Sequence, residues 1–185
     1  KVGGPRGVGA LAVVRGVVLR PIITGGGQEA GFRSGTQNVP GIAGFARALS
    51  VIAKKRKGTE RSVLSVRNAL LKMIQESLPE VIVNGTLKHR VPNNVNVSLR
   101  GINADVVVTK LDVLGVAAST GTACAVGEQI SPVVLAIAPH DVWRAQSAVR
   151  FTIGPYAKMS DVKKINNAYV QAVAYARESF KELKK

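Results

Sequence analysis

The chain contains a single cysteine, Cys124, and this feature strongly constrains how its 185 residues can be held together. A lone cysteine cannot form an internal disulfide, so a stable fold has to come from the burial of apolar side chains. Hydrophobic residues make up 46% of the chain and aromatic residues only 4%, which predicts an aliphatic core. The length suits one globular domain, or one domain with part of another.

The surroundings of Cys124 leave two interpretations open. It lies in residues 119–127, STGTACAVG, whose glycines and small polar side chains are typical of a loop. The thiol is either a reactive group that the loop presents or an inert side chain buried at the end of a strand. Taken alone, the second is favoured, because free cysteine is among the most buried residue types.

Basic residues exceed acidic ones, with 26 Lys and Arg against 11 Asp and Glu and a net charge of +15. Such an excess attracts polyanions or acidic proteins. Much of it lies in short runs at 54–57 and 181–185, which are typical of solvated helix ends. Basic and aromatic residues do not interleave, so nucleic acid is not the expected partner. No apolar run approaches the roughly 20 residues that cross a membrane, and no metal site is expected.

The first forty residues are rich in glycine. A Gly/Pro turn at 3–7 leads into a predicted strand at 10–14, which resembles the middle of a fold, so we expect a further N-terminal portion. Residues 24–40 contain five glycines, and Arg33, Ser34 and Thr36 could donate hydrogen bonds to an anion. This segment is either an anion-binding loop or a surface crossover, and glycine content alone favours the crossover.

The rest of the chain alternates helical and strand patterns. Pro40 opens a predicted helix that ends at Gly58, a plausible boundary, and Thr59 caps the next. The further expected elements are strands at 81–83, 95–99 and 148–153, a helix that begins at Asn103 or Ala104 and is closed by Gly115, short helices capped by Ser131 and Asp141, and a long amphipathic helix capped by Ser160. His89 and His140 are assigned no function.

Four motifs in this order resemble the C-terminal half of a cysteine desulfurase of the NifS/IscS branch of the class V aminotransferase superfamily. They are KVGGPRGVGAL at 1–11, GGGQE at 25–29 running into RSGTQNVPG at 33–41, STGTAC at 119–124 and SAVRFTIG at 147–154. The family usually has Ser-Gly-Ser-Ala-Cys where this chain has Thr-Gly-Thr-Ala-Cys. The resemblance covers nearly the whole chain.

The resemblance implies a role for four residues. Lys1 matches the lysine that forms a Schiff base with pyridoxal 5'-phosphate, and Thr36 matches the threonine that reaches the cofactor phosphate of the partner subunit. Cys124 matches the nucleophile that accepts sulfur. Arg150 matches the arginine that binds the substrate carboxylate, for which a planar guanidinium is well suited.

The implied fold is α/β, the end of the large domain of a pyridoxal-phosphate-dependent transferase followed by a small α+β C-terminal domain. Residues 1–58 would form the C-terminal part of the large cofactor-binding domain, and residues 59–185 the small domain with the cysteine loop. Family residues that contact the cofactor ring are absent from this sequence, so the isolated segment is expected to be inactive.

The implied reaction converts L-cysteine to L-alanine and leaves a persulfide on Cys124, for iron-sulfur cluster or thio-cofactor assembly. The implied partners are a second copy of the chain, in a homodimer, and a sulfur-acceptor protein such as an iron-sulfur scaffold. The expected location is an intracellular, reducing compartment, the cytoplasm or an organelle matrix. Two alternatives stay open: a selenocysteine lyase or another class V enzyme, and a non-catalytic basic module that binds proteins or nucleic acid.

Overall fold

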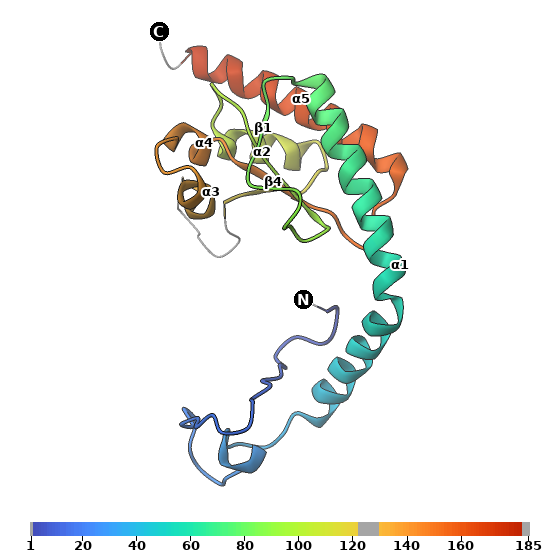
Figure 1. Ribbon diagram of the computed structural model, residues 1–185, viewed down its shortest axis with the longest axis vertical. Coiled ribbons are helices and arrows are strands. Elements are labelled where there is room, and N and C mark those ends of the chain that lie inside the picture. Colours follow the sequence, from blue (N-terminus) through green and yellow to red (C-terminus); the bar gives the residue numbers. More distant parts are fainter. Residues whose placement is uncertain (1, 122–129, 183–185) are drawn as a thin grey trace. The chain divides into compact units, whose positions relative to one another are not determined.

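The structure is a computed structural model that describes residues 2–121 and 130–182 (Figure 1). Its contacts divide the chain into two compact units, residues 1–57 and 58–185, and each is considered by itself. In chain order the elements are η1 Glu29–Gly31, α1 Val39–Ser77, β1 Ile82–Val83, β2 Asn94–Ser98, α2 Ala104–Val113, β3 Ser119–Thr120, α3 Pro132–Ile137, α4 Val142–Gln146, β4 Val149–Thr152 and α5 Met159–Glu182.

The first unit is mostly loop before α1 begins. The predicted strand at 10–14 is wrong: these residues have no regular structure, and Leu11 and Val14 are 79% and 78% exposed. A strand needs a neighbour to satisfy its backbone N–H and C=O groups, and the described residues of this unit contain no strand that could pair with it. Residues 10–14 therefore do not form a strand, although their apolar pattern is typical of one.

Helix α1 corrects a second expectation. We expected one helix to end at Gly58 and Thr59 to cap another, but α1 runs without a break from Val39 to Ser77. A glycine inside a helix costs only about 1 kcal/mol relative to alanine. The flanking Lys, Arg and Glu residues are good helix formers, which is enough to offset that cost.

The second unit is built on a four-stranded sheet in the order β1-β2-β4-β3, in which every neighbouring pair is antiparallel. Three of these strands lie where the sequence predicted strands. The fourth, β3, is formed by Ser119 and Thr120, which the sequence analysis assigned to the cysteine loop. The loop therefore begins directly from an edge strand of the sheet.

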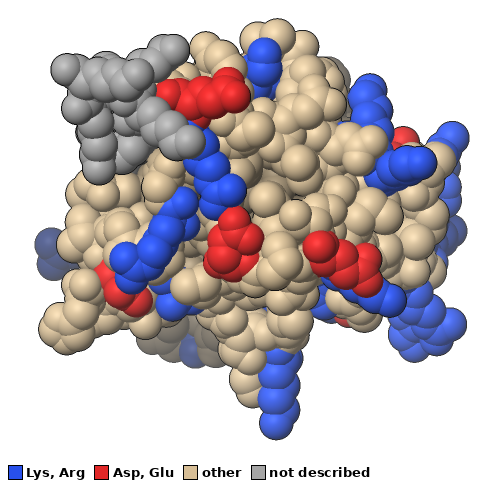
Figure 2. Space-filling model, turned by 90° about the horizontal axis from the view of Figure 1, so that it is seen from above, with Lys and Arg blue, Asp and Glu red and all other residues tan. Residues whose placement is uncertain are grey.

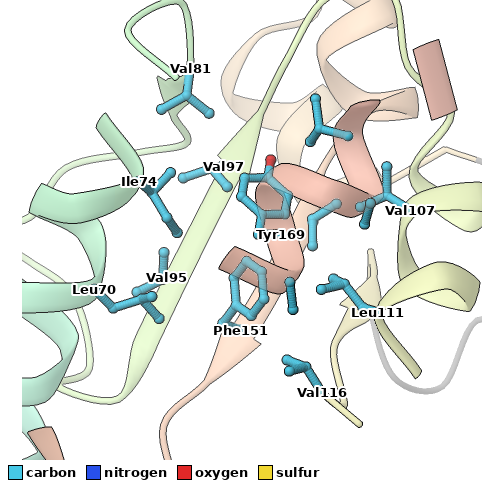
Figure 3. Close-up of a cluster of buried hydrophobic side chains, with 14 of the residues drawn as sticks. Leu70, Ile74, Val81, Val95, Val97, Val107, Leu111, Val116, Phe151 and Tyr169 are labelled. Carbon is cyan, nitrogen blue, oxygen red and sulfur yellow. The ribbon is translucent and has the colours of Figure 1, made fainter. Parts of the chain in front are cut away.

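Alternation along β2 and β4 gives this sheet two different faces. Val95 and Val97 of β2 and Val149 and Phe151 of β4 are buried on one face, where they pack against side chains of α1, α2 and α5. Figure 3 shows Leu70 and the rest of this cluster gathered around the ring of Tyr169. The residues between them along each strand point to the opposite face.

One of the four predicted helix caps, Ser131, is confirmed, while Thr59 lies inside α1 and Asn103, expected only as a possible start of its helix, also acts as a cap. The Asn103 side chain accepts a hydrogen bond from the Asp105 N–H at 2.8 Å, and Ser131 Oγ accepts one from the Val134 N–H at 3.4 Å. Asp141 precedes α4 but makes no capping bond, and its carboxylate accepts from the Trp143 indole N–H instead. Ser160 lies inside α5, which begins at Met159.

The sheet face opposite the main core is covered by α3 and α4. Val134, Ala145 and Ala148 form a small separate cluster there, with Ile130 and Leu135 packed against it. Because this cluster is small, it leaves room beside it for the polar side chains of the sheet. Those side chains, and not the main core, form the candidate site.

Tyr169 provides a direct test of the core. Its ring packs edge-on against Phe151 with the centroids 5.4 Å apart, and its buried hydroxyl has no hydrogen-bond partner among the described residues. Burial raises the pKa of Tyr169 above its ordinary value, so the hydroxyl stays neutral at physiological pH.

We therefore expect Tyr169→Phe to leave the free energy of unfolding unchanged or to raise it by about 1 kcal/mol, because an unpaired polar group is removed. Tyr169→Ala should lower it by about 3–5 kcal/mol through loss of packing. Urea unfolding followed by circular dichroism measures both. A loss of more than about 1 kcal/mol in the Phe variant would mean that the hydroxyl is hydrogen-bonded after all.

Candidate functional site

Arg150 lies on the polar face of the sheet, at the centre of three paired strands. It is directly opposite Asn96 in β2 and Ser119 in β3. Its side chain is half-buried, and its Nη1 donates a hydrogen bond of 2.9 Å to the carbonyl oxygen of Gly121. The sheet therefore holds this guanidinium next to the point where the chain leaves β3.

The two described ends of the cysteine loop lie close together. A Cβ atom added to Gly121 would come within 3.4 Å of Ser131 Cα, so the chain returns to almost the place where it left. Gly121 also has a φ of +58°, a backbone conformation that favours glycine. Cys124 itself lies outside the described residues, but both ends of its loop are anchored beside Arg150.

A cavity of about 460 Å³ lies against this polar face. It is lined by residues of the 84–94 loop, of β2 and β4, and of the start of α3: Asn84, Gly85, Thr86, His89, Arg90, Asn94, Asn96, Gly121, Ser131, Val133, Val134, Ile137 and Arg150. A lining that combines two arginines and several amides with aliphatic side chains suits a small molecule with an anionic end.

Asn84 organises the wall of the cavity. Its side chain is 2% exposed, and its Nδ2 donates to Asn96 Oδ1 and to Ser98 Oγ, each at 2.7 Å. Its backbone N–H donates to the Asn96 carbonyl at 2.9 Å. A buried amide with all of these bonds made fixes the orientation of Asn96, the residue paired with Arg150.

Arg144 extends the same network from α4. Its Nε donates to Asn84 Oδ1 at 2.6 Å and its Nη2 to the Val83 carbonyl at 2.9 Å, while its own carbonyl accepts from Ser98 Oγ at 2.6 Å. The guanidinium thus joins residues about 60 positions apart in sequence and ties α4 to the edge of the sheet.

Arg90 contributes a second cation to the cavity. It donates hydrogen bonds to the carbonyl oxygens of Asn84 and Thr86 and to Asn94 Oδ1. Burial lowers the pKa of Arg90, and the positive charge of Arg67 lowers it further. Arg90 nevertheless remains protonated at any physiological pH, because an arginine starts so far above neutrality.

In the first unit, the glycine-rich segment holds itself together by local hydrogen bonds. The Gly27 N–H donates to the buried Ser34 Oγ at 3.3 Å, and the Gly35 N–H donates to Gln28 Oε1 at 2.9 Å. Thr36 follows at once and is exposed. The segment therefore presents Thr36 on a locally braced loop.

Lys1 lies outside the described residues, but the turn that follows it is described. A Cβ atom on Gly44 would come within 2.6 Å of Pro5 Cγ, so this turn rests against α1 at a place that only glycine allows. A Cβ atom on Gly4 would meet Phe45 Cα at 3.3 Å. These close contacts place the turn on the helix within the first unit.

The described residues fit pyridoxal phosphate at its phosphate end. Thr36 offers an exposed hydroxyl, and the Arg33 side chain beside it is exposed and cationic, so both are chemically suited to an oxyanion. The lysine that would hold the aldehyde end is Lys1, and its position is not described.

Sequence reasoning found Arg150 but missed Asn84, Asn96 and Arg144. Asn96 could have been recognised, since it alternates with Val95 and Val97 and so must face away from the core. Asn84 was assigned no role. The partnership with Arg144 carries no signal in a single sequence, and His89, which was given no role, lines the cavity.

Charge is mixed on the face that Figure 2 shows, where acidic side chains lie between basic ones. In the described part of the chain no three His, Cys, Asp or Glu side chains gather in a way that could hold a metal ion. Among the same residues, no helix is long and apolar enough to cross a membrane.

Comparison with known proteins identifies relatives. The chain is 40% identical over 164 residues to a protein named cysteine desulfurase IscS 1 of Archaeoglobus fulgidus, and the match covers 88% of this chain and 42% of the relative. It is 37% identical over 180 residues to a cysteine desulfurase IscS of an Anaeromyxobacter species, and this match covers 96% of this chain and 44% of the relative. The chain thus spans less than half the length of these relatives.

Solved structures are similar in fold. A NifS-like protein matches with a TM-score of 0.82 and 29% identity, covering 94% of this chain and 44% of that one. A NifS-like protein of Rickettsia africae, at 23% identity, matches with a TM-score of 0.74. This match covers 85% of this chain and 41% of that one. The α/β fold is therefore that of NifS-like proteins.

The model of the class-V aminotransferase family matches residues 1–165, which is most of the chain. This match agrees with the family that the four glycine-rich and arginine-containing motifs indicated. The chain belongs to the class-V aminotransferase family.

Proposed function

We propose that this chain is the carboxyl-terminal portion of a pyridoxal-phosphate-dependent cysteine desulfurase, which converts L-cysteine to L-alanine and collects the sulfur on Cys124. The observation that carries the proposal is the hydrogen bond between Arg150 and Gly121, because it holds a guanidinium, which is chemically suited to a carboxylate, at the start of the cysteine loop. Relatives named cysteine desulfurase support it.

Arg150 would bind the substrate carboxylate within the cavity. Its Nη1 is engaged by the Gly121 carbonyl, so the rest of the guanidinium is available to a carboxylate, and Asn96 stands opposite in the neighbouring strand. A charged, forked donor in a half-buried site favours a planar anion over a neutral group. The substrate would thus be held with its side chain free to face the loop.

Cys124 would act as a thiolate on the substrate sulfur. A new S–S bond forms as the substrate C–S bond breaks, the electron pair stays with the carbon, and a proton then completes alanine. When bound, pyridoxal phosphate supplies an electron-accepting ring for that electron pair. Lys1 would hold the cofactor and move the proton at the α-carbon, and Thr36 would bind the phosphate of the partner subunit's cofactor.

The same proposal assigns the two units and the partners. Residues 1–58 would complete the large cofactor-binding domain, and residues 59–185 would form the small α+β domain that carries the loop. A homodimer is proposed, because Thr36 would serve the neighbouring subunit. The persulfide would pass to an acceptor such as an iron-sulfur scaffold in a reducing intracellular compartment.

Cys124→Ala is the first test, made in the complete protein loaded with cofactor. Release of sulfide and formation of persulfide from L-cysteine should fall more than about 100-fold, because the nucleophile is lost. The yellow colour of the bound cofactor should persist. Persulfide formation at the original rate would reject Cys124 as the acceptor, and preference for selenocysteine over cysteine would instead indicate a selenocysteine lyase.

Arg150→Lys tests the substrate site. Lysine keeps the charge but loses the fork, so kcat/KM for L-cysteine should fall by about 10- to 100-fold, chiefly through a higher KM, with the cofactor still bound. Arg100→Lys is the control, since Arg100 is exposed, stacks on Trp143 and does not line the cavity. An unchanged KM in the Arg150 variant would contradict the assignment.

A further inference from the structure

Two asparagines of β2, Asn94 and Asn96, line the cavity beside Arg150, and their orientation decides what the cavity can bind. Each amide has an acceptor end, the carbonyl oxygen, and a donor end, the amino group. No Asp or Glu is among the described residues that line the cavity. The cavity therefore selects anions only if the asparagines turn their amino groups toward it.

Two independent contacts fix the orientation of the buried Asn84 amide. Arg144 Nε lies 2.6 Å from Asn84 Oδ1, and an arginine can only donate, so this atom has to be the carbonyl oxygen. Ser98 Oγ donates its single proton to the Arg144 carbonyl, so it has to accept from Asn84 Nδ2, which is 2.7 Å away. Both contacts lead to the same orientation, with the amino group of Asn84 directed at β2.

The orientation of Asn84 determines that of Asn96. Asn84 Nδ2 donates its second proton to Asn96 Oδ1 at 2.7 Å, so the acceptor end of the Asn96 amide is occupied within the protein. No hydrogen bond among the described residues uses Asn96 Nδ2, and the side chain is half-buried in the wall of the cavity. The donor end of Asn96 is therefore left for a ligand.

Asn94 is held in the same way. Arg90 Nη1 donates to Asn94 Oδ1 at 3.2 Å, which again occupies the acceptor end of the amide. With the guanidinium of Arg150, the polar wall thus presents donors from three side chains. A carboxylate has two oxygens that accept from such donors, whereas a carboxamide has one oxygen and an amino group that would meet donors.

We propose that Asn96 binds the carboxylate of a small amino acid together with Arg150, and that Arg144 is a positioning residue that acts through Asn84. Asn96 and Arg150 are directly opposite on paired strands, where Cβ atoms lie roughly 5 Å apart, so both side chains can reach one carboxylate. The choice of amino acid rests on the proposed function. The preference for a carboxylate rests on the hydrogen bonds alone.

The test compares L-alanine, the product of the proposed reaction, with L-alaninamide, which has a neutral carboxamide in place of the carboxylate. Isothermal titration calorimetry of the complete protein, loaded with cofactor, measures both dissociation constants. The wild type should bind L-alanine at least about 10-fold more tightly than L-alaninamide. Asn96→Asp keeps the oxygen that Asn84 needs but turns an anionic oxygen toward the ligand. L-alanine should then bind about 30-fold more weakly or worse, and L-alaninamide unchanged or more tightly.

Asn93→Asp is the matched control. It adds the same charge three positions away, at a residue that does not line the cavity, and should leave both dissociation constants within about 3-fold of the wild type. Arg144→Lys tests the positioning role. Lysine keeps the charge but cannot hold both Asn84 and the Val83 carbonyl, so the preference for L-alanine should fall by about 3- to 10-fold, although residue 144 does not line the cavity.

Three results would overturn the proposal: unchanged binding of L-alanine by Asn96→Asp, equal loss of both ligands in that variant, or the same loss in Asn93→Asp. Should Asn96→Asp not fold, Arg144→Lys decides, and an unchanged preference in it would reject the proposal. A protein that shows the expected change of preference but forms no persulfide from L-cysteine would refute the proposed function and support the carboxylate site.

Discussion

The register between β2 and β4 is the constraint on which the rest of the second unit depends. Val95 pairs with Phe151, and both enter the core, while Asn96 pairs with Arg150 one step along, and both face the cavity. Because side chains alternate along a strand, a slip of one residue would drive the guanidinium into the apolar core and expose the ring of Phe151. The burial of aliphatic and aromatic side chains on one face therefore fixes the direction of the Arg150 guanidinium on the other.

Nearly all of the polar side chains on the face opposite the core have hydrogen-bond partners, and these bonds make that face of the sheet rigid. Asn84 donates to Asn96 and Ser98 and accepts from Arg144, so neither end of its amide is left unpaired. Removal of one of these side chains would leave the others buried without a hydrogen-bond partner, so the network acts as a unit. The anchoring of Arg150 to Gly121 adds the cysteine loop to this frame.

Local rules predicted local structure well and failed where distant residues decide. The cap at Ser131 and the start of a helix near Asn103 could be predicted, because each depends on residues only two or three positions away. The strand expected at 10–14 could not, since a strand exists only if a neighbour pairs with it. Gly58 was given too much weight as a helix breaker, because its cost is small against nineteen helical residues on either side. In the candidate site, motifs led to Arg150, while Asn84 and Arg144 meet only through the fold. The roles of Lys1, Thr36, Cys124 and Arg150 stay predictions.

Two arginines of the second unit illustrate the difference between hydrogen bonding and charge balance. Arg144 has its donors satisfied by oxygens of Asn84 and Val83 and remains half-buried, so solvent can still screen its charge. Arg67 has almost no solvent, and two of its three nitrogens have no acceptor among the described residues. Neutral acceptors would satisfy its donors but leave a buried positive charge near that of Arg90. The Arg144 network is therefore stable by itself, whereas the buried nitrogens of Arg67 that have no described acceptor carry an unfavourable cost of desolvation.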